Sequence, residues 1–312
     1  MNAVVEIKHL YKTYYRKRWL LGSAEAFPVL KDVSLKIAPN RVLGLVGESG
    51  CGKSTLCKVL LGIEQPTAGT VCVQGKDMTG LSPAELKKLR RVMQVVYQDP
   101  YSSLDPRMTV RQQLAEPLDI HGLRRDKSSR EQFLKELLAS VGLSAAYLDR
   151  YPHEFSGGQR QRICIARALV LDPKILIADE PVSALDVSVQ AQILNLLQDI
   201  RRERQLSMLF VTHDFSVARF LCDDIAVMSQ GSIVELAPSK ELVEHPIHPY
   251  TKTLLAAVPE IGRQKLAHFT GTSVSGQKAR PFVTDGCKVV SQLKEITPGH
   301  WCTCAAEDER SL

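Results

Sequence analysis

The sequence has 312 residues, with 40 Lys or Arg against 34 Asp or Glu and a formal net charge of +6. No apolar run reaches the roughly 18 residues that a membrane-spanning helix needs, so we do not expect the chain to cross a bilayer by itself. With 44% hydrophobic residues and this mild charge, global disorder and a nucleic-acid-binding composition are excluded, and the length suits about two domains with their own cores.

The first ten residues, MNAVVEIKHL, lack the charged start and apolar stretch of a secretory signal, so we expect the protein to stay in the cytoplasm. The cysteine content agrees with that expectation. Eight cysteines scattered over this length are too sparse for a disulfide scaffold, and one of them, Cys51, falls inside a glycine-rich loop.

The first clear strand signals precede this loop. Residues 33–37 (VSLKI) alternate between apolar and polar, and residues 42–46 form a short apolar run typical of a central strand. The chain then enters GESGCGKST, which fits the phosphate-binding loop pattern between a predicted strand and a predicted helix. Glycines let backbone N–H groups converge on phosphate oxygens, and the following helix directs its positive end at them. An unrelated glycine-rich turn is the alternative, which the complete pattern disfavours.

This pattern assigns specific roles within the loop. Lys53 should reach the β and γ phosphates of a nucleotide, and the Ser54 hydroxyl should ligate Mg²⁺. The predicted nucleotide-binding residues here are Gly47, Glu48, Ser49, Gly50, Cys51, Gly52, Lys53, Ser54 and Thr55.

Two helices with capping boxes are predicted in the middle of the chain. Ser82-Pro-Ala-Glu85 opens a polar helix with Pro at its first helical position. A second box, Ser129-Arg-Glu-Gln132, precedes apolar residues that share one helical face. These apolar residues are Phe133, Leu134, Leu137, Leu138 and Val141.

Strand signals return at residues 175–178 and 208–211, with an amphipathic helix between them. Apolar strands that alternate with helices imply a parallel sheet. Residues 225–235 predict a hairpin that turns near Gln230-Gly231. Beyond about residue 236 the periodicity weakens, and we expect a C-terminal accessory segment.

Two carboxylates, Asp179 and Glu180, end the strand at residues 175–178. This position puts them at the carboxyl edge of the sheet, where α/β folds bind ligands. Asp179 can hold Mg²⁺ through water, and Glu180 can polarise the attacking water as a general base or orienting group. Alone, such a pair would be a solvated strand end, but the upstream phosphate loop favours the catalytic interpretation.

Phe155-Ser-Gly-Gly-Gln159 resembles the signature motif of ATP-binding cassette (ABC) ATPases, with Phe where Leu is usual. Ser and paired Gly before a helix expose N–H donors to an anion and could form a second phosphate site. The alternative is an ordinary helix N-cap, because Ser is a favoured capping residue.

The chain resembles an ABC ATPase, with motifs in family order from Tyr14 to His213. The resemblance implies that Tyr14 stacks on adenine, although Tyr11 and Tyr15 lie close enough in sequence to compete for that role. It implies that Gln98 senses Mg²⁺ and the attacking water, and that His213 contacts the γ phosphate. Catalytic residues are then Lys53, Gln98, Glu180 and His213, and metal ligands are Ser54, Gln98 and Asp179.

The resemblance also implies a dimer. Ser183-Ala-Leu-Asp186 is similar to the loop that crosses the dimer interface, and Asp186 belongs to the nucleotide site. Four signature residues would face the nucleotide held by the opposite subunit, so one chain alone cannot complete a site. They are Ser156, Gly157, Gly158 and Gln159.

Three further stretches resemble the ATPase subunits of dipeptide and oligopeptide importers. They lie at residues 97–107 (YQDPYSSLDPR), 149–155 (DRYPHEF) and 248–255 (HPYTKTLL). The implied function is an ATP-binding and ATP-hydrolysing subunit that energises peptide import through a membrane ABC permease. Relatives in this branch import nickel or other small solutes, so an importer ATPase for such a solute is the alternative.

A soluble ABC ATPase that acts on nucleic acid or ribosomes is a competing class. Such proteins commonly carry two cassettes, coiled-coil insertions or zinc modules, whereas this sequence shows one cassette and no such insertion. A non-catalytic regulatory cassette is disfavoured because no expected catalytic position is replaced.

The importer resemblance implies several partners. They are a second ABC ATPase subunit in a heterodimer, two transmembrane permease subunits and an external substrate-binding protein, with no nucleic acid. The chain would act peripherally at the cytoplasmic face of the inner (plasma) membrane.

The predicted fold class is α/β, with a P-loop NTPase core of the ABC type at residues 1–235. We expect a helical subdomain at about 100–160, an antiparallel β subdomain and an accessory segment at 236–312. ATP and Mg²⁺ are the expected cofactors. An iron–sulfur cluster or zinc at Cys287, Cys302 and Cys304, with His300 as a further zinc ligand, is disfavoured because the family's spacing of four thiols is broken.

Overall fold

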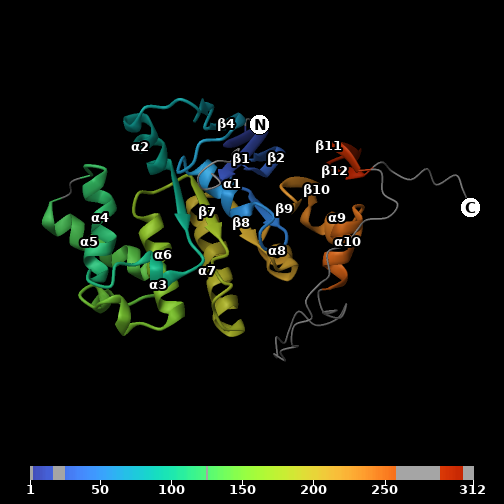
Figure 1. Ribbon diagram of the computed structural model, residues 1–312. Helices are drawn as coiled ribbons and strands as arrows, with labels where there is room; N and C mark the ends of the chain where they lie inside the picture. The colour runs from blue at the N-terminus through green and yellow to red at the C-terminus, as the bar shows by residue number, and fades with distance from the viewer. Residues whose placement is uncertain (1–2, 17–24, 124–125, 258–288, 305–312) are drawn as a thin grey trace, which may run out of the picture.

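Two β-sheets form the framework of the computed structural model, which describes residues 3–16, 25–123, 126–257 and 289–304 (Figure 1). The larger sheet comprises β3 (Val42–Val46), β6 (Met93–Val96), β7 (Ile175–Asp179), β8 (Ser207–Thr212), β9 (Asp224–Ser229), β10 (Ser232–Pro238), β11 (Val289–Thr297) and β12 (His300–Cys304). Its strand order is β11-β12-β10-β9-β3-β8-β7-β6. The five strands from β9 to β6 are parallel, and the other three add antiparallel at one edge. The α/β class with a parallel sheet is confirmed.

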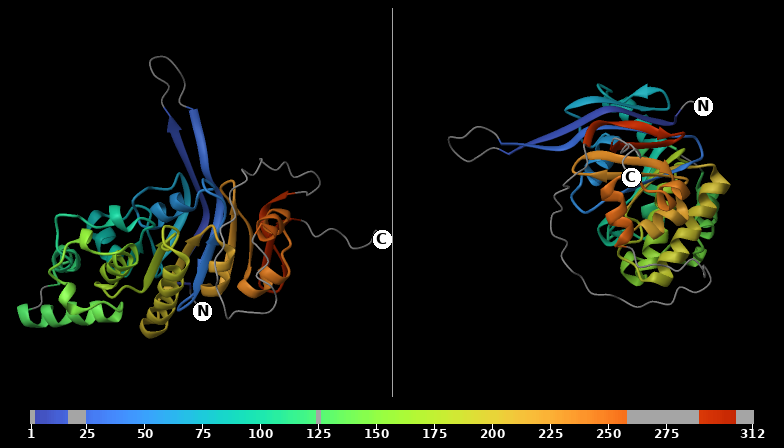
Figure 2. Two further views of the ribbon diagram at one scale, coloured as in Figure 1. Left: turned by 90° about the horizontal axis from the view of Figure 1, so that it is seen from below. Right: turned by 90° about the vertical axis from the view of Figure 1, so that its right-hand side faces the viewer.

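The smaller sheet is the antiparallel β subdomain that the sequence led us to expect. It contains β1 (Val5–Arg16), β2 (Glu25–Ile37), β4 (Ala68–Val73) and β5 (Lys76–Asp77), in the order β2-β1-β4-β5. Residues 33–37 form the end of β2, and their alternation is confirmed because Val33, Leu35 and Ile37 are buried. The outer ends of β1 and β2 project beyond the neighbouring elements (Figure 2).

The two faces of the larger sheet bury different cores. Along β3, Leu43 and Leu45 join the core that includes α1 (Lys53–Leu60) and the small sheet, whereas Val42 and Val46 join the other core. That second core is covered by α6 (Gly157–Leu169), α7 (Val187–Arg204) and α8 (Phe215–Leu221). Alternation along a strand sends successive side chains to opposite faces. Both faces of the parallel strands are therefore buried.

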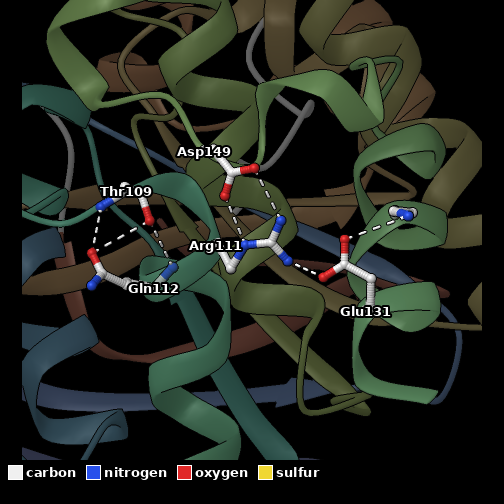
Figure 3. Close-up of polar contacts among 6 residues, drawn as sticks. Thr109, Arg111, Gln112, Glu131 and Asp149 are labelled. Atoms are coloured by element: carbon white, nitrogen blue, oxygen red, sulfur yellow. Dashed lines mark hydrogen bonds and ion pairs between the residues drawn. The ribbon is translucent and has the colours of Figure 1, made fainter. Parts of the chain in front are cut away.

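Short helices form the predicted helical subdomain. They are α3 (Pro100–Ser103), α4 (Val110–Ile120), α5 (Lys127–Ser140), η1 (Ala145–Tyr147), η2 (Pro152–Glu154) and α6. Arg111 of α4 links α5 to the segment that carries Asp149. Its guanidinium lies 2.8 and 3.2 Å from the two carboxylate oxygens of Asp149 and also binds Glu131 of α5 (Figure 3). Arg111 also lowers the pKa values of Asp149 and Glu131. A bidentate guanidinium fixes geometry more strictly than a single contact does.

The structure confirms one predicted helix start and corrects the other. Helix α2 (Pro83–Val92) has Ser82 as its N-cap in a full capping box with Glu85. The box predicted at Ser129 is wrong, because α5 begins at Lys127 and Asp126 is its N-cap, accepting from the Ser129 N–H at 2.9 Å. The apolar face of α5 is nevertheless confirmed by its buried residues, which are Leu134, Leu137 and Leu138.

The predicted hairpin is confirmed in β9 and β10, with Gln230 and Gly231 at φ of 47° and 90° in the turn. Helices α9 (Ser239–Glu244) and α10 (Pro249–Ala256) follow, and β12 pairs with β10. Residue 235, where we expect the cassette to end, lies within β10, and this division of the chain stays a prediction. These C-terminal elements and the helical subdomain lie at opposite ends of the molecule (Figure 1). In the part of the chain described, no helix is long and apolar enough to span a membrane.

Candidate active site

The loop predicted to bind phosphate joins β3 to α1 and is shaped by its glycines. Gly50 and Gly52 have φ of 82° and 115°, which residues with a Cβ rarely adopt. A Cβ on Gly47 would lie 2.2 Å from the Met228 carbonyl oxygen, so only glycine fits there. Gly52 is the N-cap of α1 and no side chain caps this end. The first N–H groups of α1 are therefore not taken by a cap and can hold an anion.

The Lys53 side chain folds back over this loop. Its ammonium donates to the carbonyl oxygens of Gly47 at 2.7 Å and Glu48 at 2.8 Å, and the residue is only 5% exposed. Carbonyl dipoles do not neutralise a buried ammonium, so a phosphate would be a stronger partner than either carbonyl. The loop therefore fits a phosphate-bearing ligand.

Asp179 and Ser54 lie together at the carboxyl end of β7. Burial, and next the carboxylate of Glu180, raise the pKa of Asp179, while the Lys53 ammonium and the Ser54 hydroxyl lower it. Carboxylate and hydroxyl oxygens are ligands that Mg²⁺ accepts, and a cation here would relieve the repulsion between the two carboxylates. The residues present fit a magnesium ion.

Glu180 and His213 meet because β7 and β8 are neighbouring parallel strands. Asp179 pairs with Val211 in the register, and the Glu180 N–H donates to the Val211 carbonyl at 3.0 Å. Glu180 has a left-handed φ of 48°, and its Oε2 lies 3.3 Å from His213 Nδ1. A carboxylate held beside an imidazole at a strand end can orient a water molecule and accept its proton.

Tyr14 reaches the helix that follows the phosphate loop. Burial, and next the Glu64 carboxylate to which the Tyr14 hydroxyl donates, raise the pKa of Tyr14, whereas the Thr55 hydroxyl lowers it. Tyr11 and Tyr15 are exposed, whereas Tyr14 is half-buried. The structure therefore brings Tyr14 to the loop region, and its stacking on adenine stays a prediction.

Gln98 is exposed in the loop between β6 and α3. Val96 of β6 pairs with Ala178 of β7, so the loop that carries Gln98 leaves the sheet at the same edge as Asp179. This location is compatible with its predicted contact to Mg²⁺ and water, which stays a prediction.

The signature residues begin α6 in the helical subdomain. Ser156 is the N-cap and forms a capping box with Gln159, so the capping interpretation holds geometrically without excluding an anion site. A Cβ on Gly158 would lie 2.5 Å from Val189 Cγ1, which makes this glycine necessary for packing against α7. Asp186, at the N-cap of α7, is exposed and its side chain makes no capping bond. Helices α6 and α1 cover opposite faces of the larger sheet, as expected if the signature residues serve a second subunit.

The structure describes only part of the C-terminal cysteine group. Cys287 and the side chain of Cys304 lie outside the described residues, whereas Cys302 is buried in β12. His300 is also buried and contacts Glu235 of β10. A metal centre at this group is therefore not tested.

Sequence reasoning missed one residue at the phosphate loop. The Glu48 N–H donates to the Tyr250 hydroxyl of α10 at 3.2 Å, although the two residues are 202 positions apart. Tyr250 lies in the HPYTKTLL stretch, and that motif was the only signal for it in the sequence.

Solved structures with a similar fold define the class. One is the dimeric structure of the ATP-binding cassette MJ0796 in a post-hydrolysis state, bound to ADP and Pi. Its sequence is 31% identical to this chain and its TM-score is 0.67, over 75% of this chain and 98% of that one. CbiO1 from Clostridium perfringens, part of the ABC transporter complex cbiONQ, is 26% identical with a TM-score of 0.67, covering 78% and 92%. The fold is that of an ABC ATPase, as the sequence predicted, and it implies ATP and Mg²⁺ as the ligands of this site.

Family and sequence comparisons narrow the class. The ABC transporter family matches residues 30–183, and the oligopeptide/dipeptide transporter C-terminal region matches residues 234–289. The oligopeptide transport ATP-binding protein OppF of Bacillus subtilis is 45% identical over 100% of this chain and 99% of its own. The dipeptide transport ATP-binding protein DppF of Lactococcus lactis is 43% identical over 96% and 93%. The chain belongs to the family of ATP-binding subunits of oligopeptide and dipeptide ABC transporters.

Proposed function

We propose that this chain binds and hydrolyses ATP to drive the import of dipeptides or oligopeptides through a membrane permease. The observation that carries this proposal is the Glu180–His213 pair beside Asp179 and the phosphate loop, in a chain similar over its whole length to peptide-transport ATP-binding proteins. Its C-terminal part matches the oligopeptide/dipeptide transporter region as well, which supports peptides as the substrate class.

Each site residue has a proposed role. The loop N–H groups and Lys53 would hold the phosphates, and Ser54, Asp179 and Gln98 would hold Mg²⁺. Bound ATP would supply the phosphoryl group whose transfer to water releases the free energy for transport, and Mg²⁺ would neutralise charge on its phosphates. Glu180 would orient the attacking water and accept its proton, while His213 would contact the γ phosphate and hold the Glu180 carboxylate.

The catalytic unit is a dimer in this proposal. Ser156 at the start of α6 would face the nucleotide of a second ATPase subunit, and the location of α6 and α1 on opposite faces of the sheet supports this arrangement. Loss of the γ phosphate contacts would open the dimer and transmit work to the permease. We propose a heterodimer with two permease subunits and an external binding protein, at the cytoplasmic face of the membrane.

The direct test is ATP turnover of the reconstituted transporter with its binding protein. Dipeptides and oligopeptides should stimulate turnover, whereas nickel chelates should not. Stimulation by nickel chelates alone would replace the peptide assignment with the small-solute importer. Copurification with RNA instead of permease subunits would favour a soluble ABC ATPase.

A further inference from the structure

Helix α10 touches the phosphate loop through one side chain. The Tyr250 hydroxyl accepts the Glu48 N–H at 3.2 Å, and its ring is half-buried against the core. Burial is the largest influence on the pKa of this hydroxyl and raises it, whereas the hydrogen bond from the Glu48 N–H lowers it. The hydroxyl is thus a neutral acceptor for the loop backbone at physiological pH.

Glu48 is held on both of its backbone polar groups. Its N–H is bound by Tyr250, and its carbonyl oxygen accepts the Lys53 ammonium at 2.8 Å. The β9–β10 turn supports the other end of the loop, where the Gly231 N–H donates to the Cys51 carbonyl at 3.0 Å. The Lys53 ammonium uses two of its three N–H donors on Gly47 and Glu48, and a bound phosphate would compete with those carbonyls, whereas the bond between Tyr250 and the Glu48 N–H does not involve Lys53.

A continuous set of hydrogen bonds connects Tyr250 to the C-terminal hairpin formed by β11 and β12. His300 Nε2 lies 2.7 Å from Glu235 Oε1, and both residues are buried, at 1% and 0% exposure. The Glu235 carboxylate also accepts the N–H groups of Ile247 at 2.8 Å and His248 at 3.1 Å, which fixes the start of α10. His248 Nδ1 in turn accepts the Tyr250 N–H at 3.1 Å. Docking of the hairpin therefore orients the residue that touches the loop.

We propose that Tyr250 is a positioning residue of the nucleotide site, and that through it the docked C-terminal hairpin sets the affinity of the phosphate loop for ATP. The proposal rests on the ATP site proposed above. Without the hydroxyl the Glu48 N–H loses its protein acceptor, so the loop samples other shapes and must be ordered when ATP binds. Pre-organisation of this kind changes affinity more than the chemical step.

The first experiment compares ATP affinity and turnover in Tyr250→Phe, which keeps the ring and removes only the hydroxyl. The dissociation constant and the KM for ATP should rise about 3- to 10-fold, as expected for one lost hydrogen bond, while kcat stays near the wild-type value. The matched control is Thr253→Ala, an exposed change on the same helix, which should leave both constants unchanged. Unchanged or tighter ATP binding in Tyr250→Phe overturns the positioning role.

Lys53→Ala separates this proposal from the one on which it rests. If Lys53→Ala keeps normal ATP binding, the nucleotide site itself is wrong. If Lys53→Ala loses ATP binding while Tyr250→Phe equals the wild type, the nucleotide site stands and the role of Tyr250 is overturned.

The second experiment tests the connection to the hairpin with a pair of variants at His300. His300→Gln keeps an amide nitrogen near the position of Nε2, whereas His300→Asn is too short to reach Glu235. His300→Asn should bind ATP more weakly than the wild type, whereas His300→Gln should bind ATP about as tightly as the wild type. In a Tyr250→Phe background, His300→Asn should weaken ATP binding little further. Equal binding by the two His300 variants, or fully additive effects with Tyr250→Phe, contradicts coupling through Tyr250.

Discussion

The Nδ1 atom of His213 lies 3.3 Å from Oε2 of Glu180, across the carboxyl ends of two neighbouring parallel strands. The Glu180 side chain is 18% exposed and that of His213 58% exposed, so the carboxylate is sheltered while the imidazole still faces solvent. The imidazole can therefore hold Glu180 in place and also meet a ligand that enters the site.

His213→Ala tests this relationship. Without the imidazole, Glu180 loses the group that orients it, so ATP turnover should fall about 100-fold or more while ATP binding changes little. Turnover of the assembled transporter and equilibrium ATP binding are the measurements. His153→Ala, at an exposed histidine in η2, is the control, and a His213→Ala enzyme as active as that control would remove His213 from the mechanism.

We expect the alkylation rate of the Cys51 thiol to depend on pH differently from that of an ordinary thiol. Burial raises its pKa above the ordinary value of 9.0, although Lys53 acts in the opposite direction. Because the thiolate is the reactive form, the rate should rise about tenfold per pH unit and keep rising past pH 9, where an ordinary thiol levels off. Bound ATP should protect Cys51, and alkylation should block ATP binding.

Mass spectrometry identifies the modified residue, and Cys51→Ser supplies the background rate from the other cysteines. Full modification of Cys51 with unchanged ATP affinity would show that this loop does not bind the nucleotide.

The paired glycines of the signature motif should behave differently when changed to alanine. A Cβ on Gly158 would lie 2.5 Å from Val189 Cγ1, so Gly158→Ala should lower the free energy of unfolding by about 1–3 kcal/mol through overpacking between α6 and α7. A Cβ on Gly157 would lie 3.5 Å from Leu185 Cδ2, an ordinary contact, so Gly157→Ala should leave stability unchanged.

Thermal unfolding checks this difference, with ATP turnover measured alongside. Gly157→Ala should still reduce turnover, because a methyl group would face the nucleotide of the opposite subunit. Equal melting temperatures for the two variants would contradict the packing explanation.

Local patterns predicted much of the framework. The central strand at residues 42–46, the capping box at Ser82 and the turn at Gln230 all depend on neighbours in sequence, and the structure contains them. Ser129 shows where local reasoning failed, because the Asp126 carboxylate three residues earlier is an equally good cap. Two candidate caps one turn apart cannot be ranked by pattern alone.

Contacts between distant segments were beyond sequence reasoning. The strand pattern predicted that Asp179 and Glu180 lie at the carboxyl edge of the sheet, but not the 3.3 Å approach of His213 to Glu180 or the left-handed backbone of Glu180. Tyr250 meets Glu48 across 202 positions of sequence, from a helix whose start is fixed by the Glu235 carboxylate of β10, and no periodicity in the sequence predicts that contact. The roles of Gln98 and His213 came from the family resemblance, whereas those of Lys53 and Glu180 followed from the phosphate-loop pattern and the strand-end carboxylates. All four roles stay predictions.

The most direct test of the account is Glu180→Gln in a transporter reconstituted into vesicles with its permease and binding protein. The amide cannot accept a proton from water, so ATP should still bind while ATP turnover and peptide uptake both fall about 100-fold or more. Turnover and peptide uptake near the wild-type rates would contradict the claim that this chain hydrolyses ATP to drive peptide import.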